Sequence, residues 1–144
     1  MPVSRDAYCG CLFYTANAFA RRITRMAEVE FLPTGLAPSS GFILMTVNDQ
    51  PGISAGELAR IMQLQPSTVT RLADRLEEEG FITRRSHRRF IHIYPTKKSS
   101  SLKAGLKTAW KSLFEHYGKL LGAEESLQLA AMLTSASDAL EADE

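Results

Sequence analysis

Hydrophobic positions between residues 54 and 79 follow helical spacing in two short runs, one directly after the other. The first run places Leu58, Ile61 and Met62 at i, i+3 and i+4, which predicts one buried stripe on a helix. Ser54, followed three residues later by Glu57, matches a capping box, in which each side chain satisfies a backbone N–H group at a helix start. We therefore expect the first helix to begin one residue after Ser54.

A second helix is predicted over residues 66–79. Pro66 suits its first position, because proline lacks the N–H group that would be unpaired there and its fixed φ is already helical. The spacing i, i+3, i+4 and i+7 then places four apolar residues on one buried face: Val69, Leu72, Ala73 and Leu76. Two helices joined by so short a turn cross at a steep angle, which is typical of a helix-turn-helix.

The opposite face of the second helix carries hydroxyl groups near its N-terminus and two arginines one turn apart. Such hydroxyls can bond phosphates or base edges, and an arginine fork matches the O6 and N7 acceptors of guanine. A helix cap and ion pairs with Glu78 or Glu79 would also account for each residue taken singly. The candidates for DNA contact on this helix are Ser67, Thr68, Thr70, Arg71 and Arg75.

A basic β-hairpin, or wing, is predicted over residues 81–95. Its strands, Phe81–Arg84 and Phe90–Tyr94, are rich in β-branched and aromatic residues, and the segment between them is charged. Residues 81–98 hold six Lys or Arg and no Asp or Glu, a local charge of +6 in a chain whose total is +1. This concentration indicates a nucleic-acid partner, with Arg88 and Arg89 at the tip reaching phosphate or an adjacent minor groove.

Long amphipathic helices are predicted at both ends of the chain, over residues 5–33 and 100–141. Apolar positions cover so much of the first helix that it needs more than one packing partner. Gly122 is expected to break the second helix. Residues 119–144 hold one Lys against six Asp or Glu, a charge of −5, so this end should face away from phosphates.

Composition fits one compact cytoplasmic domain over residues 1–144. The 44% hydrophobic content suffices for a core, and no stretch approaches the roughly 18 apolar residues of a membrane span. Cys9 and Cys11 are two positions apart on the predicted first helix, so their side chains diverge and we expect reduced thiols.

Four separated motifs occur in order along the chain: Gly52–Ala59, Gln65–Glu77, Gly80–Ile82 and Pro95–Thr96. Together they resemble the MarR-type winged-helix transcriptional regulators. The fold that this implies is mainly α, an α+β winged helix-turn-helix at 39–98 flanked by dimerisation helices. The family usually has an Asp-x-Arg at the wing tip, where this chain has the shorter, acid-free Ser86–Arg89. The family's Leu-Thr-x-x-Gly after the wing reads Pro95–Ser99 here.

The resemblance implies a homodimer on a pseudo-palindromic double-stranded operator, with helix 66–79 in the major groove, acting as a bacterial or archaeal repressor. It also implies release by a small aromatic or anionic effector, bound in a crevice beside the dimer helices. Candidate effector residues by position are Tyr14, Arg21, Arg22 and Phe42, although core packing or a solvated charge would equally account for each.

Two other hypotheses for the function stay open. Cys11-Leu12-Phe13-Tyr14 is similar to the peroxide-sensing branch of this family, which makes Cys11 a candidate redox sensor, with a buried structural cysteine as the ordinary alternative. The second hypothesis belongs to another functional class: a winged-helix protein-interaction adaptor that binds an acidic protein and does not recognise DNA.

Catalysis, a metal and a cofactor are not expected. The cysteines and histidines match no metal-ligand spacing, and the chain has no glycine-rich phosphate loop and no G-x-S-x-G nucleophile motif.

Overall fold

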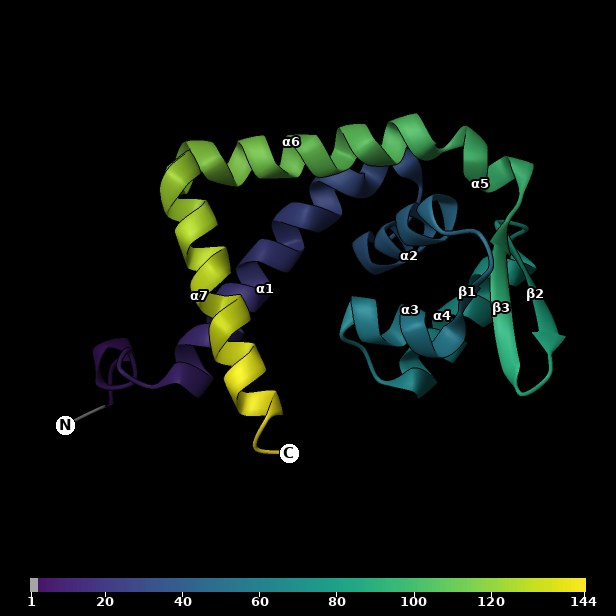
Figure 1. The fold of residues 1–144 in the computed structure, drawn as a ribbon. Helices are drawn as coiled ribbons and strands as arrows, with labels where there is room; N and C mark the ends of the chain where they lie inside the picture. Colours follow the sequence, from purple (N-terminus) through teal and green to yellow (C-terminus); the bar gives the residue numbers. More distant parts are fainter. Residues whose placement is uncertain (1–2) are drawn as a thin grey trace. The chain divides into compact units, whose positions relative to one another are not determined.

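The computed structural model describes residues 3–144, and its fold is mainly helical with one small sheet (Figure 1). The chain divides into two compact units, Met1–Ala109 and Trp110–Glu144. The elements in order are η1 (Arg5–Ala7), α1 (Leu12–Phe31), η2 (Leu32–Thr34), α2 (Pro38–Asp49), β1 (Ile53–Ser54), α3 (Ala55–Met62), α4 (Pro66–Glu78), β2 (Ile82–His87), β3 (Phe90–Pro95), α5 (Lys97–Ser101), α6 (Lys103–Leu121) and α7 (Ala123–Glu141).

Helices α3 and α4 form the predicted helix-turn-helix. The Ser54 hydroxyl accepts the Glu57 N–H at 3.1 Å and starts α3 where the sequence predicts. The Glu57 carboxylate is engaged by the Arg60 guanidinium at 2.6 Å, so an ion pair replaces the second half of the predicted capping box. Ile61 is 37% exposed, and its prediction as a buried position was wrong; Ala59 is buried on this helix together with Leu58.

The sheet is antiparallel with strand order β1-β3-β2. The predicted five-residue loop between the wing strands was wrong, because β2 continues to His87, which pairs with Phe90. Only Arg88 and Arg89 form the turn, and Arg88 has a positive φ of 60°. The wing is therefore a longer, more regular ribbon than the hydrophobic pattern indicated.

One hydrophobic core joins the winged region to α1, α2 and the start of α6 within the first unit. A Cβ at Gly41 would lie 2.6 Å from the Phe31 ring, so the close approach of α2 to that ring requires glycine. The side chains that are less than 2% exposed include Phe31, Ile43, Leu44, Val47, Leu58, Val69, Leu76, Ile82, Ile93 and Leu106.

The N-terminal helix begins later than predicted. The segment 5–11 forms the short 3₁₀ turn η1 and a further turn, and Cys11, in an extended conformation, is the residue before α1. Gly10 lies in this break, where the low helix propensity of glycine favours an interruption. Cys9 and Cys11 are both unpaired and exposed, and the helix predicted to carry them does not form there.

The second unit contains the last part of α6 and all of α7. Helix α6 ends at Leu121, and Gly122 follows with a φ of 96°, as predicted. Exposed apolar side chains are frequent along α7, where Leu127 is 58%, Met132 70% and Leu140 70% exposed. Between residues 3 and 144, no helix combines the length and the apolar character needed to cross a membrane.

Candidate DNA-binding interface

The outer face of α4 presents the predicted contact residues to solvent. Burial of Val69, Ala73 and Leu76 fixes the rotation of the helix and leaves the polar face outward. Along that face, Thr68 is half-buried, and the exposed candidates are Ser67, Thr70, Arg71 and Arg75.

The two arginines of this face differ in their surroundings. Arg75 Nε lies 3.4 Å from Glu79 Oε1, so the alternative of an ion pair along the helix applies to Arg75. Within residues 3–144, the Arg71 side chain makes no hydrogen bond or ion pair, which leaves its full donor fork available. The Thr70 hydroxyl donates to the Pro66 carbonyl at 3.0 Å and keeps its acceptor capacity. Arg71 is thus the residue best placed to read a base.

Arg84 ties the root of the wing to α4. Its Nη2 lies 2.6 Å from Asp74 Oδ1 and 3.1 Å from Glu77 Oε1, and its backbone N–H donates to Glu77 Oε2 at 2.9 Å. The hydrogen bond from Arg84 lowers the pKa of the Glu77 carboxyl and, reciprocally, raises the pKa of the Arg84 guanidinium. Asp74, an exposed residue of α4, is therefore engaged by the wing.

Lys98 is also occupied within the fold. Its Nζ donates to the Glu79 carbonyl at 2.7 Å and lies 4.4 Å from the centre of the Phe81 ring, so it neutralises the C-terminal end of α4. The Thr96 hydroxyl donates to the Gly80 carbonyl at 2.6 Å. The six basic residues of segment 81–98 thus do not act alike, because Arg84 and Lys98 make contacts within the fold that hold the wing in place.

Three of the other four basic residues lie on the wing, and the fourth, Lys97, begins α5. Arg85 stacks over the Tyr94 ring at 5.1 Å, while Arg88 and Arg89 form the exposed turn. His92 Nδ1 lies 2.9 Å from the Gly52 carbonyl and links the ribbon to the loop before β1. The wing therefore has exposed arginines at its tip and a root fixed to α4, an arrangement suited to binding a phosphate backbone.

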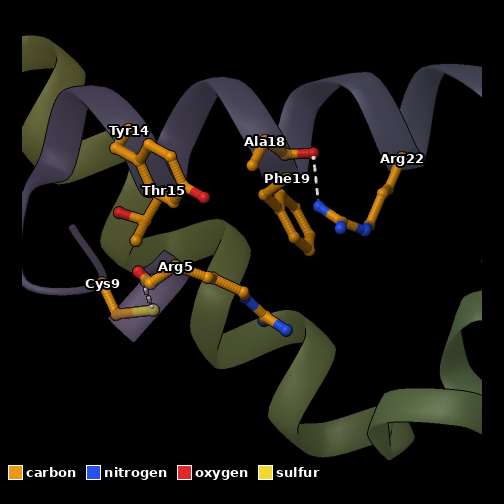
Figure 2. A pocket seen from close by; sticks show the side chains of 7 residues that line it. All are labelled: Arg5, Cys9, Tyr14, Thr15, Ala18, Phe19 and Arg22. Carbon is orange, nitrogen blue, oxygen red and sulfur yellow. Dashed lines mark hydrogen bonds between the residues drawn. The ribbon is translucent and has the colours of Figure 1, made fainter. Parts of the chain in front are cut away.

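A cavity of about 370 Å³ lies beside the N-terminal half of α1 (Figure 2). Two of the four effector candidates, Tyr14 and Arg22, line it together. Arg21 is exposed and Phe42 packs against Phe31 with ring centres 5.7 Å apart, so neither joins this cavity. The full lining is Arg5, Cys9, Tyr14, Thr15, Ala18, Phe19 and Arg22.

The cavity combines aromatic surface with two cations. Figure 2 shows the Arg5 and Arg22 side chains approaching the Phe19 side of the cavity from η1 and from α1. Arg22 Nη1 donates to the Ala18 carbonyl at 3.2 Å and leaves its other donors for a ligand. Sequence reasoning missed Arg5, because the predicted continuous helix from residue 5 did not fold η1 back beside α1. It also did not single out Phe19, since helical spacing alone does not distinguish a cavity residue of α1 from a packing residue.

Cys11 does not have the buried structural role considered above, because its thiol is exposed before the start of α1. Cys9, which the sequence did not single out as a sensor, is the cysteine in the cavity, and its Sγ donates to the Arg5 carbonyl at 3.4 Å. Among the described residues, no cluster of three His, Cys, Asp or Glu is arranged to hold a metal ion.

Comparison with known proteins gives consistent similarities. The MarR family profile matches residues 36–89. The HTH-type transcriptional repressor MdtR of Bacillus subtilis is 30% identical over 113 residues, which cover 76% of this chain and 73% of MdtR. The fold resembles the repressor CouR bound to p-coumaroyl-CoA (19% identity, 94% and 98% covered, TM-score 0.83) and Staphylococcus aureus MepR in complex with DNA (21%, 88% and 96%, 0.75).

Proposed function

The chain belongs to the MarR family of transcriptional regulators, and we propose that it is a repressor that binds a pseudo-palindromic operator as a homodimer in the cytoplasm. Proteins of this family regulate transcription and are not enzymes, so the site is a binding surface. The observation that carries the proposal is the free Arg71 on the outer face of α4, beside a wing whose root is fixed and whose tip is basic.

In the proposed complex, α4 enters the major groove. Arg71 would present its fork to a guanine, while Ser67, Thr68 and Thr70 would bond base edges or phosphates near the helix start. Arg75 would contribute once its weak contact with Glu79 opens. Arg88 and Arg89 would contact the backbone or the adjacent minor groove. MepR, which shares this fold, was solved in complex with DNA, which supports DNA as the ligand.

Dimerisation is proposed through the terminal helices within 5–33 and 100–141. Both carry apolar side chains in water: on α1, Leu12 is 83% and Phe13 80% exposed, and α7 has the exposed residues named above. A second copy of the chain would bury such surface. Two α4 helices related by a two-fold axis would then read half-sites roughly one DNA turn, about 10 bp, apart.

Repression and release by an effector are the finer parts of the proposal. MdtR and CouR are both named as repressors, and CouR was solved with p-coumaroyl-CoA. In this chain the cavity on α1 fits an aromatic anion, because Arg5 and Arg22 supply charge and Tyr14 and Phe19 supply ring surface. Binding there would favour one spacing of the two α4 helices over another.

Selection from a library of random DNA duplexes tests the DNA-binding proposal directly. The wild-type protein should enrich a pseudo-palindrome with half-sites about 10 bp apart. Enrichment of no sequence would contradict the proposal and favour an adaptor that docks an acidic protein.

Transcription in a purified system, from a promoter that contains the selected duplex, tests repression and release. The protein should lower transcript yield, and p-coumaroyl-CoA or a member of a panel of aromatic carboxylates should restore it. Arg22→Ala should weaken that restoration and leave DNA affinity unchanged, whereas Arg21→Ala, outside the cavity, should respond like the wild type. If the effector releases both variants from DNA equally, it does not bind in this cavity.

A further inference from the structure

The outer half of the wing carries two large apolar side chains in water. Every residue from Arg85 to Ile91 is exposed, and among them Phe90 is 61% and Ile91 45% exposed. In Figure 1 the turn between β2 and β3 stands clear of the helices. The Phe90 ring makes no ring–ring or cation–π contact with any residue in 3–144, so the fold itself gives no reason for an aromatic residue at this tip.

Phe90 has a defined position although it is exposed. It pairs with His87 across the ribbon and directly follows the turn formed by Arg88 and Arg89. Ile91 pairs with Ser86 and, because side chains alternate along a strand, points to the opposite face. The ion pairs of Arg84 fix the root of the same ribbon to α4. The position of Phe90 relative to α4 is therefore set by the pairing of β2 with β3 and by the ion pairs of Arg84.

The charged residues near Phe90 indicate which kind of partner can bind there. Arg88 and Arg89 directly precede Phe90 in the turn, and Arg85 lies on the same face of the ribbon, two residues from His87, the partner of Phe90. Segment 81–98 contains no acidic residue. A second copy of this wing would therefore be repelled. An anionic partner that also offers apolar surface is required, and the duplex held by the adjacent α4 face provides both, since phosphates flank a minor groove walled by sugars and base edges.

We propose that Phe90 is a wedge that inserts at a base step in the minor groove next to each half-site, and that it thereby kinks the operator. The proposal rests on the DNA-binding function proposed above. Proteins that bind the minor groove insert apolar side chains between base steps in this way, while neighbouring arginines hold the phosphates. Because pyrimidine–purine steps unstack most readily, Phe90 would also select such a step at a position that α4 does not touch.

The fluorescent adenine analogue 2-aminopurine reports the insertion. The probe is the duplex most enriched by the wild-type protein, with 2-aminopurine placed singly at successive positions outside each half-site. At saturating protein, wild type should raise the fluorescence at one step on each side, because the analogue brightens when it unstacks. Phe90→Ala should abolish the rise, weaken binding by about tenfold, and lose the preference for a pyrimidine–purine step.

Three controls separate insertion from other effects. Ile91→Ala removes the neighbouring exposed apolar side chain, on the opposite face, and should keep the fluorescence rise. Phe90→Leu keeps an apolar wedge and should retain part of it. Thermal unfolding of Phe90→Ala should match wild type, since the side chain is exposed.

The outcomes distinguish the wedge from the function it rests on. A duplex that is enriched and bound, but whose fluorescence is equally raised by Phe90→Ala or is not raised by wild type at any position, overturns the wedge alone. Failure of wild type to enrich any duplex overturns the DNA-binding function and the wedge with it. Loss of the rise in Ile91→Ala as well as Phe90→Ala would mean that the whole tip, and not Phe90, causes the distortion.

Discussion

Arginines of similar appearance in the sequence have different tasks because different groups surround them. Arg71 has no partner within residues 3–144, Arg84 is held by Asp74 and Glu77, and Arg88 lies on the turn of the wing. A single charge count treats them alike. Which of them contacts a ligand depends on the carboxylates that lie nearby in three dimensions, and a sequence pattern does not supply those distances.

Substitution of Arg71 and of Arg88 should separate recognition of bases from binding of the phosphate backbone. Arg71→Ala should weaken operator binding by about 1 to 3 kcal/mol and relax the preference at one base position, because a bidentate contact with guanine is lost. Arg88→Ala should weaken binding to all sequences similarly, because phosphates carry no sequence information. Affinities for the selected duplex and its single-base variants measure both effects. The opposite assignment of effects would contradict the roles proposed here.

The contact of Arg84 with Glu77 should make folding stability depend on pH in a defined direction. Because Arg84 lowers the folded-state pKa of Glu77, the carboxylate stabilises the protein above its usual pKa near 4.5, and that contribution disappears as pH falls through the lowered value. Both side chains are partly exposed, so the effect should stay below about 1 kcal/mol.

Urea unfolding between pH 6 and pH 2 tests this dependence. Glu77→Gln should lose stability at pH 6 and show a shallower decline in acid than wild type. Glu78→Gln provides the matched control, because the Glu78 carboxylate forms no ion pair with the described residues. An identical acid decline in Glu77→Gln and wild type would mean that Arg84 adds no stability through Glu77.

Asn48 and Ser99 form a buried polar contact where the wing leads into α5. Asn48 Nδ2 donates to Ser99 Oγ at 2.9 Å, and Ser99 is fully buried. Asn48→Ala should lower the free energy of unfolding by about 1 to 3 kcal/mol, because it leaves the buried hydroxyl without this donor. Lys97→Ala, at an exposed position of α5 that does not contact Asn48, should change it by less than about 0.5 kcal/mol. Equal denaturation midpoints for Asn48→Ala and wild type would show that the contact is not stabilising.

Elements were predictable where side-chain chemistry sets them locally. Ser54 and Pro66 fixed the starts of α3 and α4, because a cap and a proline at the first position act within a few residues. The length of the wing was not predictable, since Arg85, Ser86 and His87 show no apolar alternation on a ribbon exposed on both faces. Their pairing follows from the register that the two-residue turn imposes.

The start of α1 was missed for a different reason. Apolar spacing continues through residues 9–13 and hides the interruption at Gly10, whose low helix propensity costs about 1 kcal/mol. That interruption places Arg5 and Cys9 in the cavity with Tyr14 and Arg22. The candidate effector site was therefore half predictable: the α1 residues follow from helical spacing, but the residues of η1 depend on a turn that the pattern concealed.

For the complete chain, the family could be recognised from motifs in order along the sequence. The oligomeric state depends instead on apolar surfaces that no other residue between 3 and 144 covers. Leu12, Phe13 and the apolar residues of α7 are exposed in this chain, and apolar spacing alone does not distinguish an intramolecular contact from a dimer. The proposed homodimer supplies the two-fold symmetry that an operator with two half-sites needs.

A charge placed on α7 should test that assembly. Leu133 is 44% exposed, and Leu133→Asp should shift the protein from twice the 15.9 kDa chain mass toward the single chain in sedimentation equilibrium. Operator affinity should fall with it, because one half-site alone is then bound. Ser135→Asp adds the same charge two residues away and should remain a dimer. A wild-type protein that sediments as a single chain at micromolar concentration would refute the proposed dimer.

The most direct test of sequence-specific DNA binding is fluorescence anisotropy with DNA from the protein's own promoter region and an unrelated duplex of equal length, over a series of salt concentrations. Affinity for both should fall steeply with salt, with a logarithmic slope near −0.9 per phosphate contacted. If binding is sequence-specific, the preference for the promoter should persist at about physiological salt. Equal affinity for the two duplexes at every salt concentration would contradict it.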